Sequence, residues 1–99
     1  MLIRQYRCRL GELDLVCRDG NSLVIVEVRA RAGSRFASAG ESVDVRKQRK
    51  LIRATRHLLM THPHWNDYPL RFDVFCIDDI DSAAPSIRWI RNAFDAGSA

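Results

Sequence analysis

Four charged side chains in the first third of the chain have the types and spacing of a metal and phosphate site. Glu12 and Asp14 are two residues apart, and so are Glu27 and Arg29. Side chains alternate along a β-strand, so each pair is predicted to share one face. A two-residue turn at Gly20-Asn21 would set Asp14 opposite Glu27, with Glu12 then opposite Arg29. A turn one residue earlier keeps all four on one face, whereas an uncompensated loop of odd length would break the cluster.

Two carboxylates held this close need a compensating charge. Like charges opposed across strands destabilise a sheet, and Glu27 ends an otherwise apolar strand, where an unpaired carboxylate is costly. One explanation is a salt bridge from Glu27 to a nearby arginine, Arg9, Arg29 or Arg31. The other is a divalent cation, because Mg²⁺ and similar hard ions such as Mn²⁺ bind carboxylate, carbonyl and water oxygens. The residues alone leave both explanations open.

A β-hairpin predicted from Tyr6 to Arg31 would position these side chains. Its two β-rich runs are separated by residues 18–21, where the Asp-Gly and Gly-Asn steps are strong turn signals. The second run, Leu23 to Val28, is apolar at odd and even positions alike up to Glu27. A strand of this kind is buried on both faces, so it is predicted to lie in the centre of its sheet.

A long helix is predicted after a loop at residues 33–38, with Ser38 or Asp44 as its N-cap. It should end near Thr61, because the residue before Pro63 is pushed away from helical geometry. Its core stripe at the 3.6-residue period is Leu51, Ala54, Thr55, Leu58 and Leu59. Traced back one turn, this stripe passes through Lys47 and Gln48.

The rest of the helix surface is basic, and no acidic residue occurs between Lys47 and Thr61. Lys and Arg side chains that neutralise phosphates give binding that does not depend on sequence. The net charge of +4 is unevenly divided, since residues 1–56 hold thirteen Lys/Arg against six Asp/Glu, and this favours a polyanionic partner at the N-terminal half. We therefore predict a nucleic-acid-binding surface made by Arg46, Lys47, Arg49, Lys50, Arg53 and Arg56.

The last third of the chain is predicted to add two strands, Leu70 to Ile77 and a short one at Ser86 to Ile90. Residues 78–85 are interpreted as a solvated acidic loop, and residues 92–99 as a short helix or a tail. A helix that links two strands of one sheet implies that those strands are parallel. Asp73, inside the first of these strands, could be a metal ligand or the partner of an arginine. The predicted architecture is a single α/β domain, residues 1–99, with a mixed sheet.

Five motifs of the sequence resemble those of a known family. They are Gly11 to Val16, Val26 to Arg31, Glu41 to Val43 with Lys47, Arg71 to Val74, and Trp89 to Phe94. In sequence and order they resemble the YraN-like family of uncharacterised bacterial proteins, which is assigned to the PD-(D/E)XK, or restriction-endonuclease-like, superfamily. The resemblance implies a restriction-endonuclease-like core from which the family's N-terminal helix is absent. A missing helix would expose one face of the sheet and favour a homodimer.

The resemblance also implies roles for individual residues. Asp14 and Glu27 would bind Mg²⁺ or Mn²⁺, together with the backbone carbonyl of Val28. Arg29 stands where the superfamily has a lysine, and Lys47 is the candidate for a lysine that has moved to the helix. Arginine cannot act as a general base, although it can bind a phosphate or neutralise developing charge. Additional site candidates are Glu12, Gln48 and Asp73.

The function implied is a metal-dependent nuclease, with DNA favoured over RNA as its substrate. The alternatives are a catalytically inactive nucleic-acid-binding module of the same fold and a protein-interaction subunit. No apolar run is long enough to cross a membrane, and we expect a cytoplasmic protein. Cys8, Cys17 and Cys76 lack the spacing of a zinc site or a disulfide framework, and are interpreted as small buried hydrophobes.

Overall fold

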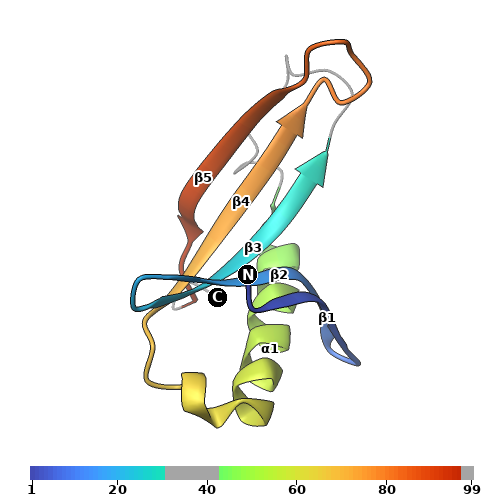
Figure 1. Ribbon diagram of the computed structural model, residues 1–99. Helices are drawn as coiled ribbons and strands as arrows, with labels where there is room; N and C mark the ends of the chain where they lie inside the picture. The colour runs from blue at the N-terminus through green and yellow to red at the C-terminus, as the bar shows by residue number, and fades with distance from the viewer. Residues whose placement is uncertain (31–42, 97–99) are drawn as a thin grey trace.

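The computed structural model describes residues 1–30 and 43–96, which form one five-stranded mixed sheet with a single α-helix packed on it (Figure 1). The strands follow one another across the sheet in chain order. This confirms the predicted α/β class with a mixed sheet. The elements are β1 (Ile3–Cys8), β2 (Gly11–Asp19), β3 (Ser22–Ala30), α1 (Val45–Thr61), the 3-10 turn η2 (Pro63–Trp65), β4 (Leu70–Asp78) and β5 (Ser86–Phe94).

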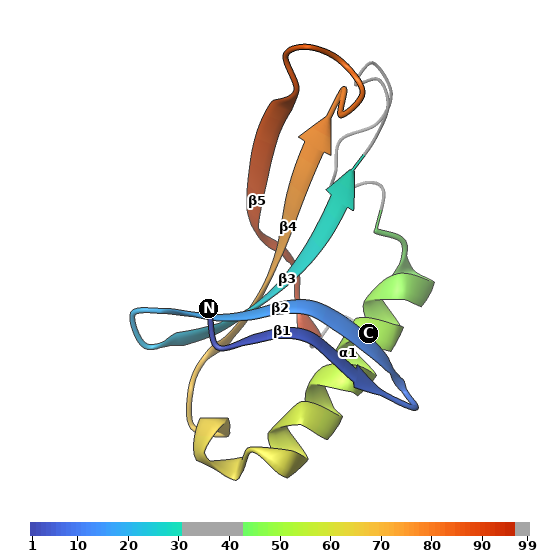
Figure 2. The ribbon, with the colours of Figure 1, turned by 45° about the vertical axis from the view of Figure 1, so that its right-hand side comes forward.

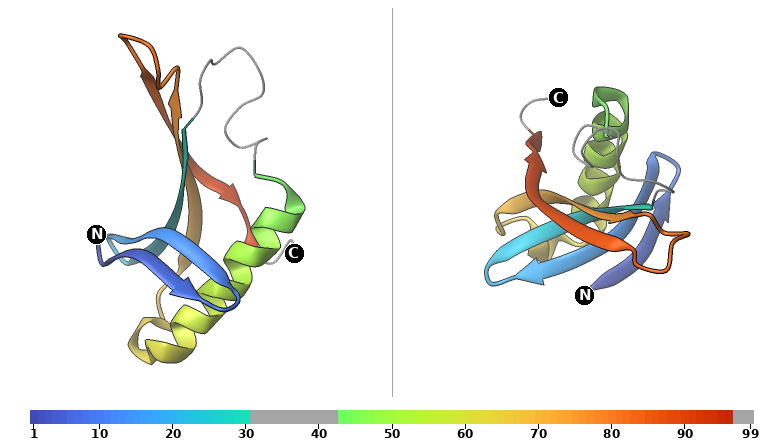
Figure 3. Two further views of the ribbon diagram at one scale, coloured as in Figure 1. Left: turned by 90° about the vertical axis from the view of Figure 1, so that its right-hand side faces the viewer. Right: turned by 90° about the horizontal axis from the view of Figure 1, so that it is seen from above.

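The strand pairing places β3 at the centre of the sheet, as its apolar run predicts. β3 is antiparallel to β2 and parallel to β4, whereas β1 and β5 pair antiparallel at the two edges. The predicted parallel pair on either side of the helix is therefore confirmed. α1 lies against one face of the sheet (Figure 3), and it is not long and apolar enough to span a membrane.

The turn between β2 and β3 has two residues, Gly20 and Asn21, which is one of the turns that the sequence leaves open. Asp19 pairs with Ser22, and the register continues without a shift to Leu15 and Val26. Gly20 adopts a φ of +59°, a left-handed conformation that glycine reaches without strain. The next position along this register would set Asp14 across from Glu27, the first of the two arrangements considered above.

The first β-rich run is two strands instead of one, which corrects the predicted hairpin. β1 and β2 are joined by a tight turn, and Cys8 pairs with Gly11. The sequence of this turn, Arg9-Leu10-Gly11, contains no Asn, Asp or Pro, so it carries only one weak turn signal. Gly11 adopts a φ of +150°, and a Cβ there would lie 3.5 Å from the Lys50 carbonyl oxygen of α1. The turn therefore lies against the helix, and the φ of Gly11 is what favours glycine there.

The β1–β2 hairpin bends sharply, so that half of β2 leaves β3 and curves over α1 (Figure 2). Pairing between β2 and β3 ends at Leu15 and Val26, whereas β2 remains paired with β1 as far as Gly11. Leu13 and Val16 are three residues apart yet lie in the same core, so β2 breaks its alternation between them. The result is a fork between β2 and β3, with Asp14 at its base.

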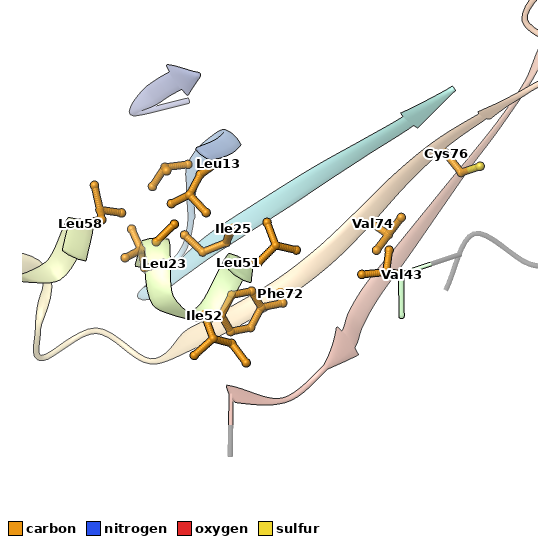
Figure 4. Close-up of a cluster of buried hydrophobic side chains, with 12 residues drawn as sticks. Leu13, Leu23, Ile25, Val43, Leu51, Ile52, Leu58, Phe72, Val74 and Cys76 are labelled. Carbon is orange, nitrogen blue, oxygen red and sulfur yellow. The ribbon is translucent and has the colours of Figure 1, made fainter. Parts of the chain in front are cut away.

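The core fills the space between α1 and one face of the sheet (Figure 4). The predicted stripe of α1 is buried at Leu51, Ala54, Thr55 and Leu58, and partly buried at Leu59. Ile52 is also buried. The sheet contributes Leu13, Val16, Leu23, Ile25, Phe72, Val74 and Cys76. The same face of β3 that carries Leu23 and Ile25 also carries Glu27, so Glu27 faces the helix from the end of this core.

The helix begins at the predicted cap, Asp44, and ends at the predicted Thr61. The Asp44 carboxylate accepts a hydrogen bond from the Lys47 backbone N–H at 2.9 Å. The alternative cap Ser38, the loop at 33–38 and Arg31 lie outside the described residues.

Replacing the cap, Asp44→Ala, is expected to lower the free energy of unfolding by about 1 kcal/mol, because a helix N–H loses its side-chain acceptor. Chemical denaturation of the variant and the parent measures this difference. Asp44→Ser should restore most of the loss, since serine caps helices well. Equal stability of the alanine variant and the parent would contradict the capping role.

Two corrections concern the end of the chain. β5 continues to Phe94, where a short helix or tail was predicted from Asn92, and residues 97–99 lie outside the described part. The strand continues because the Phe94 ring stacks on Phe72 at 4.7 Å. Asp78, predicted in a solvated loop, is only 2% exposed, and the Arg88 Nε lies 2.6 Å from its Oδ2. A long-range partner therefore allows this carboxylate to be buried.

Candidate metal and phosphate site

Asp14 lies at the base of the fork, where it replaces a missing strand contact. Its Oδ2 accepts a hydrogen bond from the backbone N–H of Val28 at 2.8 Å. Because β2 no longer pairs with β3 at this position, the Asp14 carboxylate accepts the hydrogen bond that a backbone carbonyl of β2 would otherwise accept. The bend in β2 and the position of Asp14 are thus parts of one local structure.

Glu27 is nearly buried and has two cationic neighbours. Its residue is 5% exposed. Its Oε2 lies 3.3 Å from the Lys47 Nζ of α1 and 3.7 Å from an Arg29 nitrogen of β3. The structure therefore brings Glu27 together with Arg29 and Lys47, as the sequence predicts, and the salt bridge to Arg29 is present.

These cations do not fully compensate the negative charge. The pKa of Glu27 is raised from its ordinary 4.5 to about 7, mainly by burial and also by a hydrogen bond and charge repulsion from Asp14, while Lys47 lowers it only in part. A salt bridge that fully compensated Glu27 would hold this pKa near or below 4.5. The Asp14 and Glu27 carboxyls are thus close enough to interact, and the neighbouring positive charge compensates their negative charge only in part.

The donor set fits a small hard cation. Mg²⁺ is commonly bound by one or two carboxylates and keeps several waters, whereas zinc and calcium sites use more protein ligands. Among the described residues, no group of three or more His, Cys, Asp or Glu side chains surrounds a possible ion position. Asp14 also lines an open surface pocket of about 300 Å³, together with Arg4, Gln5, Leu15 and Val28. Water therefore has access to the Asp14 side of the site.

Comparison with known proteins identifies relatives along nearly the whole chain. The family described as "Uncharacterised protein family UPF0102" matches residues 1–77. A UPF0102 protein of Stutzerimonas stutzeri strain A1501 is 49% identical over 96 residues, which span 97% of this chain and 79% of the relative. One of Legionella pneumophila strain Philadelphia 1 is 41% identical over 97 residues, spanning 98% and 80%. One of Pseudomonas putida strain GB-1 is 42% identical over 95 residues, spanning 96% and 77%.

The chain belongs to family UPF0102. This is the YraN-like family whose motifs the sequence resembles.

Two additional site candidates of this UPF0102 member lie away from the carboxylate pair. Glu12 was expected opposite Arg29, but the bend in β2 carries it beyond the fork, where its Oε2 lies 3.2 Å from the Arg7 Nε at the surface. The Gln48 amide donates to the Val43 carbonyl at 3.0 Å, so it secures the start of α1. Neither side chain has a recorded contact with Asp14 or Glu27 in the described part of the chain.

Asp73, the third additional candidate, lies on the opposite face of the sheet from Glu27. It is in register with Val26, whereas Glu27 is in register with Val74. Both Asp73 oxygens accept hydrogen bonds, from two Arg71 nitrogens at 2.9 and 3.1 Å, the Trp89 Nε1 at 2.9 Å and the Asn92 N–H at 2.9 Å. Burial raises the pKa of Asp73, but these hydrogen bonds outweigh it and lower the pKa below 3.8. Of the two roles left open, Asp73 has the structural one.

The basic residues of the helix divide into two groups. Lys47 turns toward Glu27, whereas five residues, Arg46, Arg49, Lys50, Arg53 and Arg56, are exposed to solvent. The six predicted nucleic-acid-binding residues therefore do not form one surface. Sequence reasoning also missed Arg4 and Gln5 beside Asp14. The alternation of Tyr6 and Cys8 with Arg7 and Arg9 could have indicated β1, but no local signal places Arg4 and Gln5 beside Asp14.

Proposed function

We propose that this UPF0102 protein is a metal-dependent phosphodiesterase that acts on nucleic acid, with DNA favoured over RNA. The observation that carries the proposal is Glu27, a buried carboxylate beside Asp14 whose pKa remains about 7 although Lys47 lies 3.3 Å away. Perturbed carboxylates that share one site occur preferentially at functional positions. The proposed active site has the restriction-endonuclease-like arrangement of the PD-(D/E)XK nucleases that the motifs suggest.

In this proposal each charged residue has a separate task. Asp14, Glu27 and the Val28 carbonyl would hold Mg²⁺ or Mn²⁺. A divalent ion bound there would act as a Lewis acid on the phosphodiester and lower the pKa of a coordinated water. Arg29 neutralises phosphate charge but does not take up a proton, since a guanidinium stays protonated at any working pH. Lys47 supplies a second positive charge from the helix.

The second candidate function is a nucleic-acid-binding module without catalysis. It is favoured by the five exposed basic residues of α1, which could bind phosphates whether or not a metal is held. A protein-interaction role, or a homodimer, would use the sheet face opposite α1. There Leu15, Cys17, Val26, Val28, Phe75 and Trp89 line an apolar pocket of about 270 Å³.

Titration with Mn²⁺ or Mg²⁺ tests the metal site directly. The parent is expected to bind the ion and to unfold at a higher temperature in its presence, because the ion relieves the repulsion between Asp14 and Glu27. Asp14→Asn and Glu27→Gln should each weaken binding by about tenfold or more, because loss of a direct ligand should cost at least as much as loss of an outer-shell partner. Glu12→Gln is the matched control, since Glu12 is an exposed carboxylate on the same hairpin.

Cleavage assays then separate the two candidate functions. The parent should cleave single-stranded, duplex or branched DNA only with Mg²⁺ or Mn²⁺, and the Asp14 and Glu27 variants should lose this activity while the Glu12 variant keeps it. Metal binding without cleavage of any of these substrates would favour the binding module. The nuclease proposal would be refuted if neither ion changed the stability of the parent and the parent cleaved none of these substrates.

A further inference from the structure

The solvent-facing side of α1 has an unusual charge distribution. Arg46, Arg49, Lys50, Arg53 and Arg56, here called the α1 basic face, recur at spacings of three and four residues, so they lie along one side of the helix. Within the described ranges 1–30 and 43–96, none of the five forms an ion pair with a carboxylate, although five other cationic side chains do. Repulsion among five unpaired cations on one helix destabilises it, which suggests a role outside the fold.

The dimensions of the face suit two rows of phosphates. Arg46 and Arg56 are ten residues apart, or about 15 Å at the helical rise of about 1.5 Å per residue. The major groove of B-form DNA is about 12 Å wide, so long arginine side chains at the two ends of the face can reach phosphates on both of its edges. Between them, Arg49, Arg53 and Arg56 surround Ile52 in a shallow pocket of about 210 Å³.

We propose that the α1 basic face docks the phosphate backbone of duplex nucleic acid without reading its sequence. This inference deepens the proposed function by naming its substrate class. The face ends at Arg46, and the next residue, Lys47, reaches Glu27. A duplex on this face is therefore held beside the end of the helix that carries the candidate site.

The composition of the face argues against other anionic partners. Single strands are held by bases stacked on aromatic side chains, and α1 has no Phe, Tyr or Trp. A helix that lies in a membrane surface needs an exposed apolar side, but the apolar side of α1 is buried against the sheet. The amide that could read base edges, Gln48, is bonded to the Val43 carbonyl. These features favour the phosphate backbone of a duplex as the partner. Because arginine can also contact guanine edges, equal binding of unrelated sequences is the test of the sequence-independent mode.

Fluorescence anisotropy with short DNA duplexes of two unrelated sequences, in EDTA, tests the proposal. Both duplexes should bind with equal affinity and more tightly than the matching single strand. If all five residues contact phosphates, the slope of log K against log salt should be about −4.5, at about 0.9 per contact. The triple variant Arg49→Ala, Arg53→Ala, Arg56→Ala should reduce the slope by about 2.7 and weaken binding on the order of 10²-fold at about 0.1 M salt.

A second triple variant, Arg7→Ala, Arg18→Ala, Arg91→Ala, removes the same charge from exposed positions on the strands and should retain the affinity of the parent. Equal losses in the two triple variants would overturn the proposal, because they would indicate only an effect of net charge. Single strands that bind as tightly as duplexes, or anionic vesicles that bind while duplexes do not, would also overturn it. Glu27→Gln should bind duplex in EDTA at least as well as the parent, so failure of the metal site and failure of this surface give different results.

Discussion

Asp73→Ala is expected to lower the free energy of unfolding by about 3–5 kcal/mol, the usual cost of removing one partner from a buried ion pair. Asp73 is 1% exposed, and the variant would leave Arg71, the Trp89 indole N–H and the Asn92 N–H without this acceptor. Asp73→Asn should lose most of the same stability, because an amide presents one oxygen and a competing NH₂ to donors on both sides. The loss comes from the partly buried donors that lose this acceptor.

Urea denaturation of the variants and the parent measures this effect, and Asp67→Ala, at an exposed position, is the control. Hydrogen bonds lower the pKa of Asp73, so its contribution is fully present above the ordinary pKa of 3.8 and is lost as the pH falls through the lower pKa of the folded protein. A variant that no longer unfolds cooperatively would agree with the prediction. A change in stability no larger than that of the Asp67 variant would contradict it.

Glu27→Gln is expected to act in the opposite direction and to stabilise the metal-free protein above pH 7. The folded protein holds a proton on Glu27 up to a pKa of about 7, whereas the unfolded chain releases it near 4.5. The ionised form therefore costs the fold about 3 kcal/mol once the pH exceeds both values. Glutamine removes this cost and keeps the size of the side chain.

The pH dependence distinguishes this effect from a general gain in stability. The advantage of Glu27→Gln should be full above about pH 7, shrink as the pH falls through the interval down to 4.5, and vanish below it, where Glu27 is protonated in both states. Thermal unfolding in EDTA across this range measures it, with Glu12→Gln as a control that shows no such interval. A variant less stable than the parent above pH 7 would mean that the salt bridges to Lys47 and Arg29 dominate.

These two carboxylates show what sequence reasoning can and cannot predict here. The end of α1 and the central position of β3 were predictable, and the turn at Gly20-Asn21 and the cap at Asp44 were among the alternatives considered, because these features depend on residues close together in the chain. The contact of Lys47 with Glu27 was also predictable. Lys47 lies on the inward side of the helix, and the alternation of β3 places Glu27 on the face that the helix covers.

The sequence left Asp73 open between a metal ligand and the partner of an arginine, because two of its donors, Trp89 and Asn92, come from the distant strand β5. Asn92 reaches Asp73 from a left-handed backbone conformation, with a φ of +52°, at an irregularity in the pairing of β5. The bend in β2 could not be predicted either. The alternation of buried and exposed residues breaks between Leu13 and Val16 because both side chains pack on the core beneath α1. Positions decided by contacts between distant elements leave no periodic pattern in the sequence.

The fork between β2 and β3 makes the candidate site depend on how firmly the hairpin is held. Asp14 belongs to the hairpin and Glu27 to the central strand, and the Tyr6 hydroxyl links the hairpin to His57 of α1. A transient lifting of the hairpin from the helix would part the two carboxylates while β3, β4 and β5 stayed paired. The Val28 N–H donates to the Asp14 carboxylate, so its hydrogen-exchange rate is expected to follow the opening of the hairpin. The free energy of that local opening, which is at most that of global unfolding, sets the fraction of molecules in which the site is assembled.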